Sequence, residues 1–258
     1  MGQEGSAAAY DGSDAIELRR VLALPRVELF ESIGSTLDVA HALAEQGAPA
    51  GTLVVADSQT SGRGRAGRSW TSPPGAGVWL TLVERPPDAA ALEVLSLRLG
   101  LYAARTLDPF AGGPVTLKWP NDLYLAGRKL AGILTEARWR DGRPEWVAVG
   151  FGLNVMAPHG VPAASLRRGT SRVAVLRALV PALRAAAAAS GELSSEELAE
   201  YAERDSARGR PCIEPRRGVV EGISSRGELL VATPSGSVRA RGGSLVLEDG
   251  PSAREGES

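Results

Sequence analysis

Lysine and asparagine are almost absent from this chain of 258 residues, which has two of each and takes its other basic side chains from arginine. The four scarce residues are Lys118, Asn121, Lys129 and Asn154, and they all fall within one short stretch. A lysine ammonium on a flexible stem differs from the rigid fork of arginine, and asparagine combines a neutral donor and acceptor on a short arm. Chance survival on a solvated surface is the alternative, but the clustering favours a function that needs these side chains.

Cysteine and histidine are also scarce. The single cysteine, Cys212, excludes an internal disulfide, so we expect a reducing compartment and a cytoplasmic protein. The two histidines are far apart and do not have the spacing of metal ligands. No metal-binding residue is therefore assigned directly.

Long apolar runs are missing as well. No stretch of 18 apolar residues occurs, which excludes a transmembrane helix, and the N-terminus does not have the basic start and apolar core of a signal peptide. The net charge of −1 provides no global attraction to nucleic acid or to an anionic membrane. With 43% hydrophobic residues, however, the chain can bury a sizeable core.

Expected strands and helices alternate through most of the chain and predict an α+β fold with a mixed sheet. The expected strands are residues 27–33, 52–57, 77–84, 115–119, 123–125, 132–139 and 146–155, and the expected helices are residues 35–46, 88–107, 173–190 and a helix from 194 or 195. After residue 208, short strands separated by glycine or proline predict a small barrel that docks on the larger domain. We therefore divide the chain into a disordered or loosely attached segment (1–26), a main domain (27–208), a barrel (209–249) and a disordered tail (250–258).

The first chemical motif is an arginine–glycine segment, residues 62–70, that follows a predicted strand and ends in Trp70. Its glycines allow the backbone to approach a ligand, and its arginines offer paired donors to phosphate or carboxylate. The segment is not a phosphate-binding loop of the Gly-Lys-Ser/Thr type, because that sequence is absent. A disordered basic loop that binds nucleic acid is the alternative interpretation.

Three further motifs follow in order. Lys118-Trp119-Pro120-Asn121-Asp122 places two polar side chains on a rigid corner after a strand. Arg128-Lys129-Leu130-Ala131-Gly132 directs a lysine toward a cleft, and Gly150-Phe151-Gly152-Leu153-Asn154 puts glycines inside a strand, where they indicate close approach of another group. An Asx turn, a solvated charge and an ordinary hairpin lysine are the corresponding structural alternatives.

Together these four motifs, from about residue 29 to 157, resemble the catalytic core of the biotin–protein ligases. Ser35-Thr36 and Gln59 fit the same pattern upstream. The resemblance implies a class II synthetase-like catalytic domain with helices around a mixed sheet, followed by a small SH3-like β-barrel. It also implies ATP with Mg²⁺, biotin as substrate, and two steps: formation of biotinyl-5′-adenylate, then transfer of biotin to a lysine of a biotin carboxyl carrier domain of acetyl-CoA or a related acyl-CoA carboxylase.

The resemblance also implies residue roles. The residues expected to contact biotin are Ser35, Thr36, Gln59, Arg63, Gly64, Arg65 and Lys129. The residues expected to bind ATP are Arg68, Trp70, Asn121 and Asn154, with Trp70 near the adenine. Arg65 and Lys129 are expected to stabilise the adenylate, and Lys118 and Asp122 to support them electrostatically.

The chain departs from the pattern of the family that it resembles in two ways. That family commonly has Ser-Thr-Asn at the start of the first helix, and here Leu37 follows Thr36 in place of the asparagine, which removes one polar group near the expected biotin site. Only about 28 residues precede the predicted core, too few for the two or three packed helices of a DNA-binding domain. We therefore expect a monofunctional ligase without specific DNA binding or membrane attachment, present as a monomer or weak homodimer.

Two rival functions remain at this point. A lipoate- or octanoate-transferring ligase would share the same core, although the arginine-rich loop ending in Trp70 favours biotin. A non-catalytic nucleic-acid-binding protein could use the arginine–glycine loop, but a near-zero net charge and 5% aromatic residues argue against it.

Overall fold

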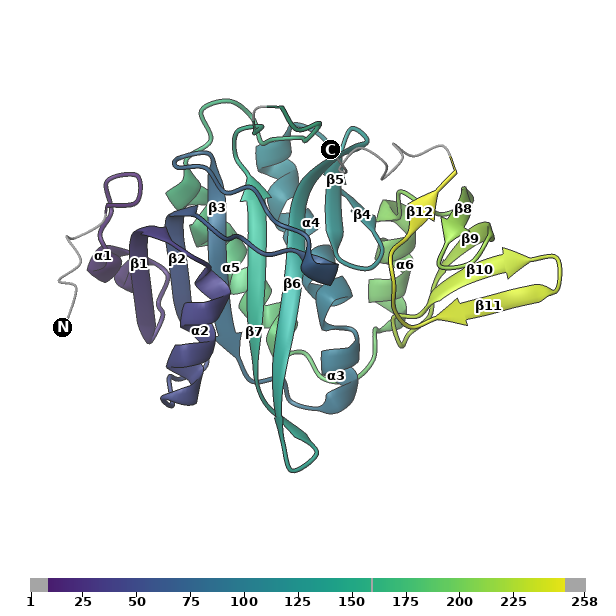
Figure 1. Ribbon diagram of the computed structural model, residues 1–258, viewed down its shortest axis with the longest axis horizontal. Coiled ribbons are helices and arrows are strands. Elements are labelled where there is room, and N and C mark those ends of the chain that lie inside the picture. The colour runs from purple at the N-terminus through teal and green to yellow at the C-terminus, as the bar shows by residue number, and fades with distance from the viewer. Residues whose placement is uncertain (1–8, 159, 249–258) are drawn as a thin grey trace.

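The computed structural model describes residues 9–158 and 160–248 and shows a large mixed sheet with a smaller sheet beside it (Figure 1). The predicted tail at 250–258 and the first eight residues of the predicted N-terminal segment lie outside the described residues. Within the described part of the chain, no helix is long and apolar enough to cross a membrane. The predicted α+β class is confirmed.

The large sheet has seven strands in the order β1-β2-β3-β7-β6-β5-β4. Their bounds are β1 Arg26–Ile33, β2 Thr52–Gln59, β3 Gly77–Glu84, β4 Thr116–Lys118, β5 Asp122–Leu125, β6 Arg128–Arg140 and β7 Arg143–Asn154. β1 and β2 are parallel, and every other neighbouring pair is antiparallel. The central strand β3 is buried along its whole length because both faces of the sheet are covered.

Helices cover both faces. α2 (Thr36–Glu45) crosses from β1 to β2 and packs Leu37, Ala40 and Leu43 on one face. α4 (Leu95–Ala111) and α5 (Arg172–Ala188) pack on the opposite face, preceded by the short helix α3 (Ala89–Glu93). Figure 1 shows α2 in front of the sheet with α4 and α5 behind it. The loop that follows β2 crosses in front of β7 and β6, on the same face as α2.

The prediction that residues 1–26 are disordered or loosely attached is wrong for the part that the structure describes. Tyr10 is fully buried and donates its hydroxyl proton to the Gly77 carbonyl at 3.1 Å. Arg172 lies over the Tyr10 ring and pairs with Asp11 at 2.6 Å. α1 (Ala15–Val21) follows and buries Leu18. These contacts span more than 60 residues of chain, so local composition did not reveal them.

The C-terminal part forms a second sheet of five short strands in the order β11-β10-β9-β8-β12. Their bounds are β8 Pro211–Glu214, β9 Gly218–Ile223, β10 Leu229–Thr233, β11 Gly236–Ala240 and β12 Val246–Leu247. Among the described strands no ladder joins β11 to β12, so the sheet is open and the predicted SH3-like barrel is not confirmed. Trp119, which follows β4, donates from its Nε1 to the Gly227 carbonyl at 3.0 Å. This bond holds the C-terminal sheet beside β4.

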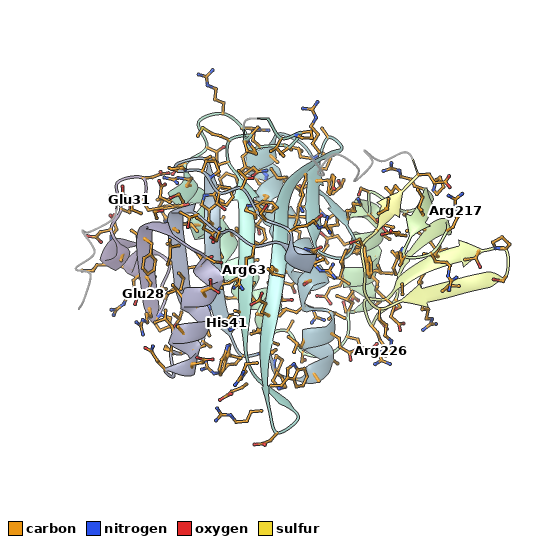
Figure 2. The ribbon with its side chains drawn as sticks, viewed as in Figure 1. Glu28, Glu31, His41, Arg63, Arg217 and Arg226 are labelled. Carbon is orange, nitrogen blue, oxygen red and sulfur yellow. The ribbon has the colours of Figure 1, made fainter. Side chains whose placement is uncertain are left out.

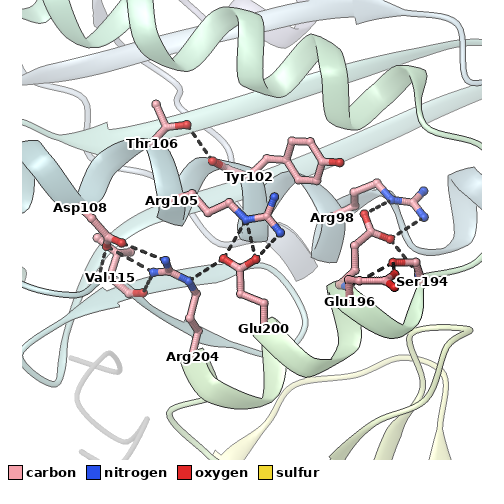
Figure 3. Close-up of polar contacts among 11 residues, drawn as sticks. Arg98, Tyr102, Arg105, Thr106, Asp108, Val115, Ser194, Glu196, Glu200 and Arg204 are labelled. Atoms are coloured by element: carbon pink, nitrogen blue, oxygen red, sulfur yellow. Dashed lines mark hydrogen bonds and ion pairs between the residues drawn. The ribbon is translucent and has the colours of Figure 1, made fainter.

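Ion pairs fasten α6 (Ser195–Arg204), the helix that leads into the C-terminal sheet, to α4 (Figure 3). Arg98 is the buried member: its Nε donates to Glu197 Oε1 at 2.7 Å, and its Nη2 donates to the Glu192 carbonyl at 2.7 Å. Glu197 also closes the capping box of α6 with Ser194. Toward the other end, the more exposed Arg105 pairs with Glu200. One buried guanidinium thus connects α4 to the start of α6.

The Arg98→Met substitution is expected to lower the free energy of unfolding by about 3 kcal/mol, because it leaves the Glu197 carboxylate and three backbone carbonyls without their buried partner. The control Arg105→Met removes a pair whose arginine side chain is 42% exposed and should cost less than about 1 kcal/mol. Urea denaturation measures both values. Equal losses for the two variants would contradict the central role of Arg98.

Candidate functional site

A cleft opens on the α2 face of the large sheet, beneath the loop that follows β2. The space in the cleft, counted together with its open mouth, is about 740 Å³. Eleven of the thirteen predicted site residues line it: Ser35, Thr36, Gln59, Arg63, Gly64, Arg65, Arg68, Trp70, Asn121, Asp122 and Lys129. The structure therefore brings together residues that are almost 100 positions apart in the chain.

The start of α2 forms one wall of the cleft. Gln59 Oε1 accepts hydrogen bonds from the backbone N–H and the hydroxyl of Thr36, at 2.9 and 3.1 Å. Gln59 Nε2 donates to Ser72 Oγ at 2.9 Å, so Gln59 joins the helix start to the far end of the loop. Ser35 is the helix N-cap, but its buried Oγ makes no capping bond and has no partner among the described residues. An unpartnered buried hydroxyl on a cleft wall indicates a site for a polar ligand atom.

A glycine floor lies at the centre of the sheet. Gly132 on β6 and Gly152 on β7 are directly opposite each other. A Cβ on Gly152 would lie 2.6 Å from Trp70 Cε2, and one on Gly132 would lie 3.0 Å from Trp70 Cζ3. The indole of Trp70 thus lies against backbone that any other residue would obstruct. Its Nε1 is buried without a hydrogen-bond partner in the described part of the chain.

Charged groups stand along one edge of this floor. Lys129 Nζ lies 2.8 Å from Asp122 Oδ1 and 5.1 Å from the centroid of the Trp70 ring. Asp122 is in register with Lys118 on β4 and with Gly132 on β6. Burial lowers the pKa of Lys118, Asp122 acts in the opposite direction, and Lys129 lowers it further. Asp122 is therefore the carboxylate that offsets two neighbouring ammonium groups.

Arg65 points from the loop toward the corner after β4. Its Nη1 donates to Asn121 Oδ1 at 3.3 Å, and Asn121 Nδ2 donates to the Ile133 carbonyl at 2.6 Å. Burial lowers the pKa of Arg65, while the nearby Asp122 raises it. Since a guanidinium titrates far above neutral pH, Arg65 remains a cation in the cleft. Arg65 and Lys129 therefore place two positive charges on one cavity.

The other two arginines of the loop, Arg63 and Arg68, lie at the rim of the cleft. Figure 2 shows Arg63 in front of the sheet, with His41 on the neighbouring α2. Arg63 Nη2 pairs with Asp38 at 2.7 Å. Arg68 Nη2 donates to Ser244 Oγ at 3.3 Å, which joins the loop to the segment between β11 and β12. The loop thus contacts both α2 and the C-terminal sheet.

Two predicted site residues lie outside the lining of the cleft. Lys118 is half-buried at the sheet edge, with its ammonium 5.6 Å from the Tyr124 ring centroid. Asn154 is buried at the end of β7, opposite Gly77. The sequence argument correctly expected close approach at the glycines of β7, but the group that approaches Gly152 is Trp70. The roles predicted for Lys118 and Asn154 stay predictions.

Sequence reasoning missed most of the apolar lining. Leu37, Leu80, Ile133, Leu134 and Phe151 complete the cleft walls. Leu37 is buried, and its Cδ1 would lie 3.3 Å from a Cβ on Gly150, so Gly150 leaves room for the larger side chain. The sequence predicted a strand at residues 77–84 but did not indicate that Leu80 faces the cleft. Which face of the sheet carries the cleft depends on where the loop crosses, and no local pattern encodes that.

The described residues contain no group of three or more His, Cys, Asp or Glu side chains that could hold a metal ion. The polar lining of the cleft consists mainly of cations, hydroxyls and amides, with Asp122 paired to Lys129. This set of donors fits an anionic organic ligand.

Comparison with known proteins gives a consistent family. Residues 29–154 match the family model described as "Biotin/lipoate A/B protein ligase family". The biotin--[acetyl-CoA-carboxylase] ligase of Paracoccus denitrificans is 33% identical over 209 residues, which cover 71% of this chain and 85% of that protein. The bifunctional ligase/repressor BirA of Bacillus spizizenii is 43% identical over 130 residues, or 48% of this chain. The chain spans only 38% of the length of that bifunctional relative.

Solved structures agree. A biotin protein ligase from Aquifex aeolicus, in complex with biotin and ATP, superposes with a TM-score of 0.70 at 25% identity, covering 87% of this chain and 99% of that chain.

The Gly152→Ala substitution is expected to lower the free energy of unfolding by about 1–3 kcal/mol, because the new methyl group would overlap Trp70 Cε2. Alanine ordinarily suits a strand better than glycine, so a loss would report the clash. In the control Gly113→Ala, the nearest atom is Leu125 Cδ1 at 3.8 Å, and stability should not fall. Urea denaturation with near-ultraviolet circular dichroism measures both effects, and an unchanged aromatic signal in Gly152→Ala would contradict the contact.

Proposed function

The chain belongs to the family of biotin–protein ligases, and we propose that it is an ATP-dependent ligase that forms biotinyl-5′-adenylate and transfers biotin to a carrier-protein lysine. The observation that carries the proposal is the convergence of Arg65 and Lys129 on one cleft whose floor is Gly132 and Gly152. The buried and unpartnered Ser35 Oγ on the same wall supports a ligand with polar atoms.

The first step sets a chemical requirement that this cleft meets. The carboxylate of biotin attacks the α-phosphorus of ATP, an oxygen–phosphorus bond forms, and pyrophosphate leaves with the electrons of the bond that breaks. Both reactants are anions, so cations aimed at the developing charge provide the main rate enhancement. Arg65 and Lys129 supply these charges, and Asp122 holds Lys129 in place at 2.8 Å. The reaction requires no nucleophile from the protein.

The cleft residues divide between two ligands in this proposal. The residues assigned to biotin are Ser35, Thr36, Gln59, Gly64, Arg65 and Lys129, with Arg63 at the rim. The residues assigned to ATP are Arg68, Trp70, Asn121 and Asn154, with Mg²⁺ accompanying the nucleotide. The hydrogen bonds of Gln59 to Thr36 and Ser72 support this division, because they hold the biotin wall and the end of the loop together. Lys118 acts through Asp122, its partner in the strand register.

The second step needs an acceptor lysine from another protein. We assign this role to a biotin carboxyl carrier domain of an acetyl-CoA or related acyl-CoA carboxylase, in the cytoplasm, with the ligase as a monomer or weak homodimer. The named ligase of Paracoccus denitrificans supports the choice of carboxylase. We also assign the main domain, 27–208, to the class II synthetase-like architecture. Residues 209–249 are assigned to an SH3-like module whose sheet is open.

Transfer of lipoate or octanoate is the second candidate, because the matching family model includes lipoate ligases. The named biotin ligase of Paracoccus denitrificans and the Aquifex aeolicus structure with biotin and ATP favour biotin. Adenylation assays with biotin and with lipoate in parallel discriminate the two activities.

Lys129→Ala is expected to reduce biotin-dependent ATP–pyrophosphate exchange by about 100-fold or more, as loss of a charge-stabilising donor does in other enzymes. Its unfolding transition should change little, since the Lys129 side chain is 36% exposed. The matched control is Arg128→Ala, which removes the adjacent exposed cation and should retain activity. Near-normal exchange in Lys129→Ala would remove this lysine from its proposed role.

Residues 62–70 are expected to become more resistant to trypsin when biotin and ATP are both present, because ligand contacts by Arg65 and Arg68 would order the loop. Mass spectrometry of the fragments identifies cleavage after each arginine. Cleavage that is equally fast with and without the two ligands would argue against ligand-induced ordering.

A further inference from the structure

We propose that Asp38 on α2 and Glu136 on β6 are positioning residues that anchor the arginine–glycine loop through Arg63 and thereby fix Arg65 in the cleft. Arg63 Nη2 lies 2.7 Å from Asp38 Oδ1 and 3.8 Å from Glu136 Oε2. Neither carboxylate lines the cleft, so neither is in place to contact a ligand there. Asp38 lies on α2 and Glu136 lies on β6, the two elements between which the loop passes.

Glu136 is itself held in position by His41. His41 Nε2 lies 2.9 Å from Glu136 Oε2, and Trp146 Nε1 lies 3.3 Å from His41 Nδ1. An indole N–H only donates, so Nδ1 must accept and the imidazole proton must reside on Nε2. In this arrangement His41 Nε2 donates to Glu136 Oε2 and helps to hold the carboxylate in place. Arg63 thus meets two carboxylates whose combined charge it offsets only in part.

The inner bonds of the loop transmit this anchor to Arg65. Gly64 N donates to the Arg68 carbonyl at 2.7 Å, and Trp70 N donates to the Gly62 carbonyl at 2.8 Å. Arg63 and Ser69 form an antiparallel bridge between them. Residues 62–70 therefore form a closed turn whose two ends are hydrogen-bonded to each other. Fixing Arg63 on the outside of this turn restricts the direction of Arg65, two residues farther along.

The consequence is a separation of roles within one motif. Arg65 donates to Asn121 Oδ1 inside the cleft, whereas Arg63, at the rim of the cleft, pairs with the carboxylates on α2 and β6. Losing the anchor should raise the population of loops in which Arg65 has left the cleft, so the affinity for biotin should fall. The rate of the chemical step at saturation should stay nearly the same, because the bound loop restores the same contacts. The inference about catalysis rests on the proposed function, but the inference about the loop does not.

The first experiment measures the loop itself, in the whole chain without biotin or ATP. Asp38→Asn, Glu136→Gln and the double variant are digested briefly with trypsin, and mass spectrometry measures cleavage after Arg63, Arg65 and Arg68. Cleavage in the double variant should be about fivefold faster than in the parent, since partly exposed ion pairs make modest contributions to local order. Glu28→Gln is the matched control: it removes a carboxylate paired to Arg26 at 2.7 Å on β1, away from the loop (Figure 2).

The second experiment measures biotin-dependent ATP–pyrophosphate exchange in the same variants. The KM for biotin should rise about fivefold in the double variant, while kcat stays within about twofold of the parent. This pattern indicates weaker binding of biotin without loss of contacts that form only in the transition state. The single variant Asp38→Glu, which keeps the negative charge, should have a KM for biotin close to that of the parent. Thermal unfolding should show that all variants remain folded at the assay temperature.

The outcomes are distinct. Loop cleavage and KM equal to those of the parent in the double variant would overturn the anchor. An equal change in Glu28→Gln would also overturn it, since the effect would then be general. If the parent itself shows no biotin-dependent exchange, the proposed function fails, and the digestion still decides whether Asp38 and Glu136 hold the loop.

Discussion

Two glycines without side chains, facing each other across β6 and β7, are the constraint on which the rest of the site depends. Because Gly132 and Gly152 have no Cβ, the Trp70 indole can lie directly against the backbone of the sheet. That contact fixes the end of the arginine–glycine loop, and the fixed loop brings Arg65 to Asn121. Larger side chains at these two positions would lift Trp70 from the floor and open the cleft. Backbone exposure inside the sheet is thus what gives the loop a defined place.

Asp122 explains why lysine persists in a chain whose other cations are arginines. It stands in the strand register next to Lys118 and pairs with Lys129 across 2.8 Å. The ammonium of Lys129 must also lie 5.1 Å from the Trp70 ring centroid, beside the glycine floor. A compact charge on a flexible stem can satisfy both neighbours, whereas the planar guanidinium of arginine needs more width. The scarcity of lysine was therefore informative because it marked a geometric requirement.

Local sequence patterns predicted the helices and strands well, but they did not predict which distant segments of the chain contact each other. The strand expected at residues 77–84 is β3, and the helix expected at 35–46 is nearly α2. By contrast, composition suggested disorder where Tyr10 is buried beneath Arg172, because glycine, alanine and acidic residues near the N-terminus conceal one aromatic anchor. A small barrel was expected from strand spacing, which does not determine whether the first and last strands pair. The motifs predicted most of the polar cleft because each of them includes residues that line it.

The loop also contacts three separate parts of the molecule: α2, the corner after β4, and the segment between β11 and β12. Its first arginine contacts Asp38 on α2, its second contacts Asn121, and its third contacts Ser244 between β11 and β12. The segment around Ser244 belongs to the C-terminal sheet, which Trp119 holds against the corner that precedes Asn121. The loop therefore links α2 to the C-terminal sheet. Because Arg63 and Arg68 are exposed, each of their contacts is individually weak. Anchors of this strength can order the loop without preventing its movement.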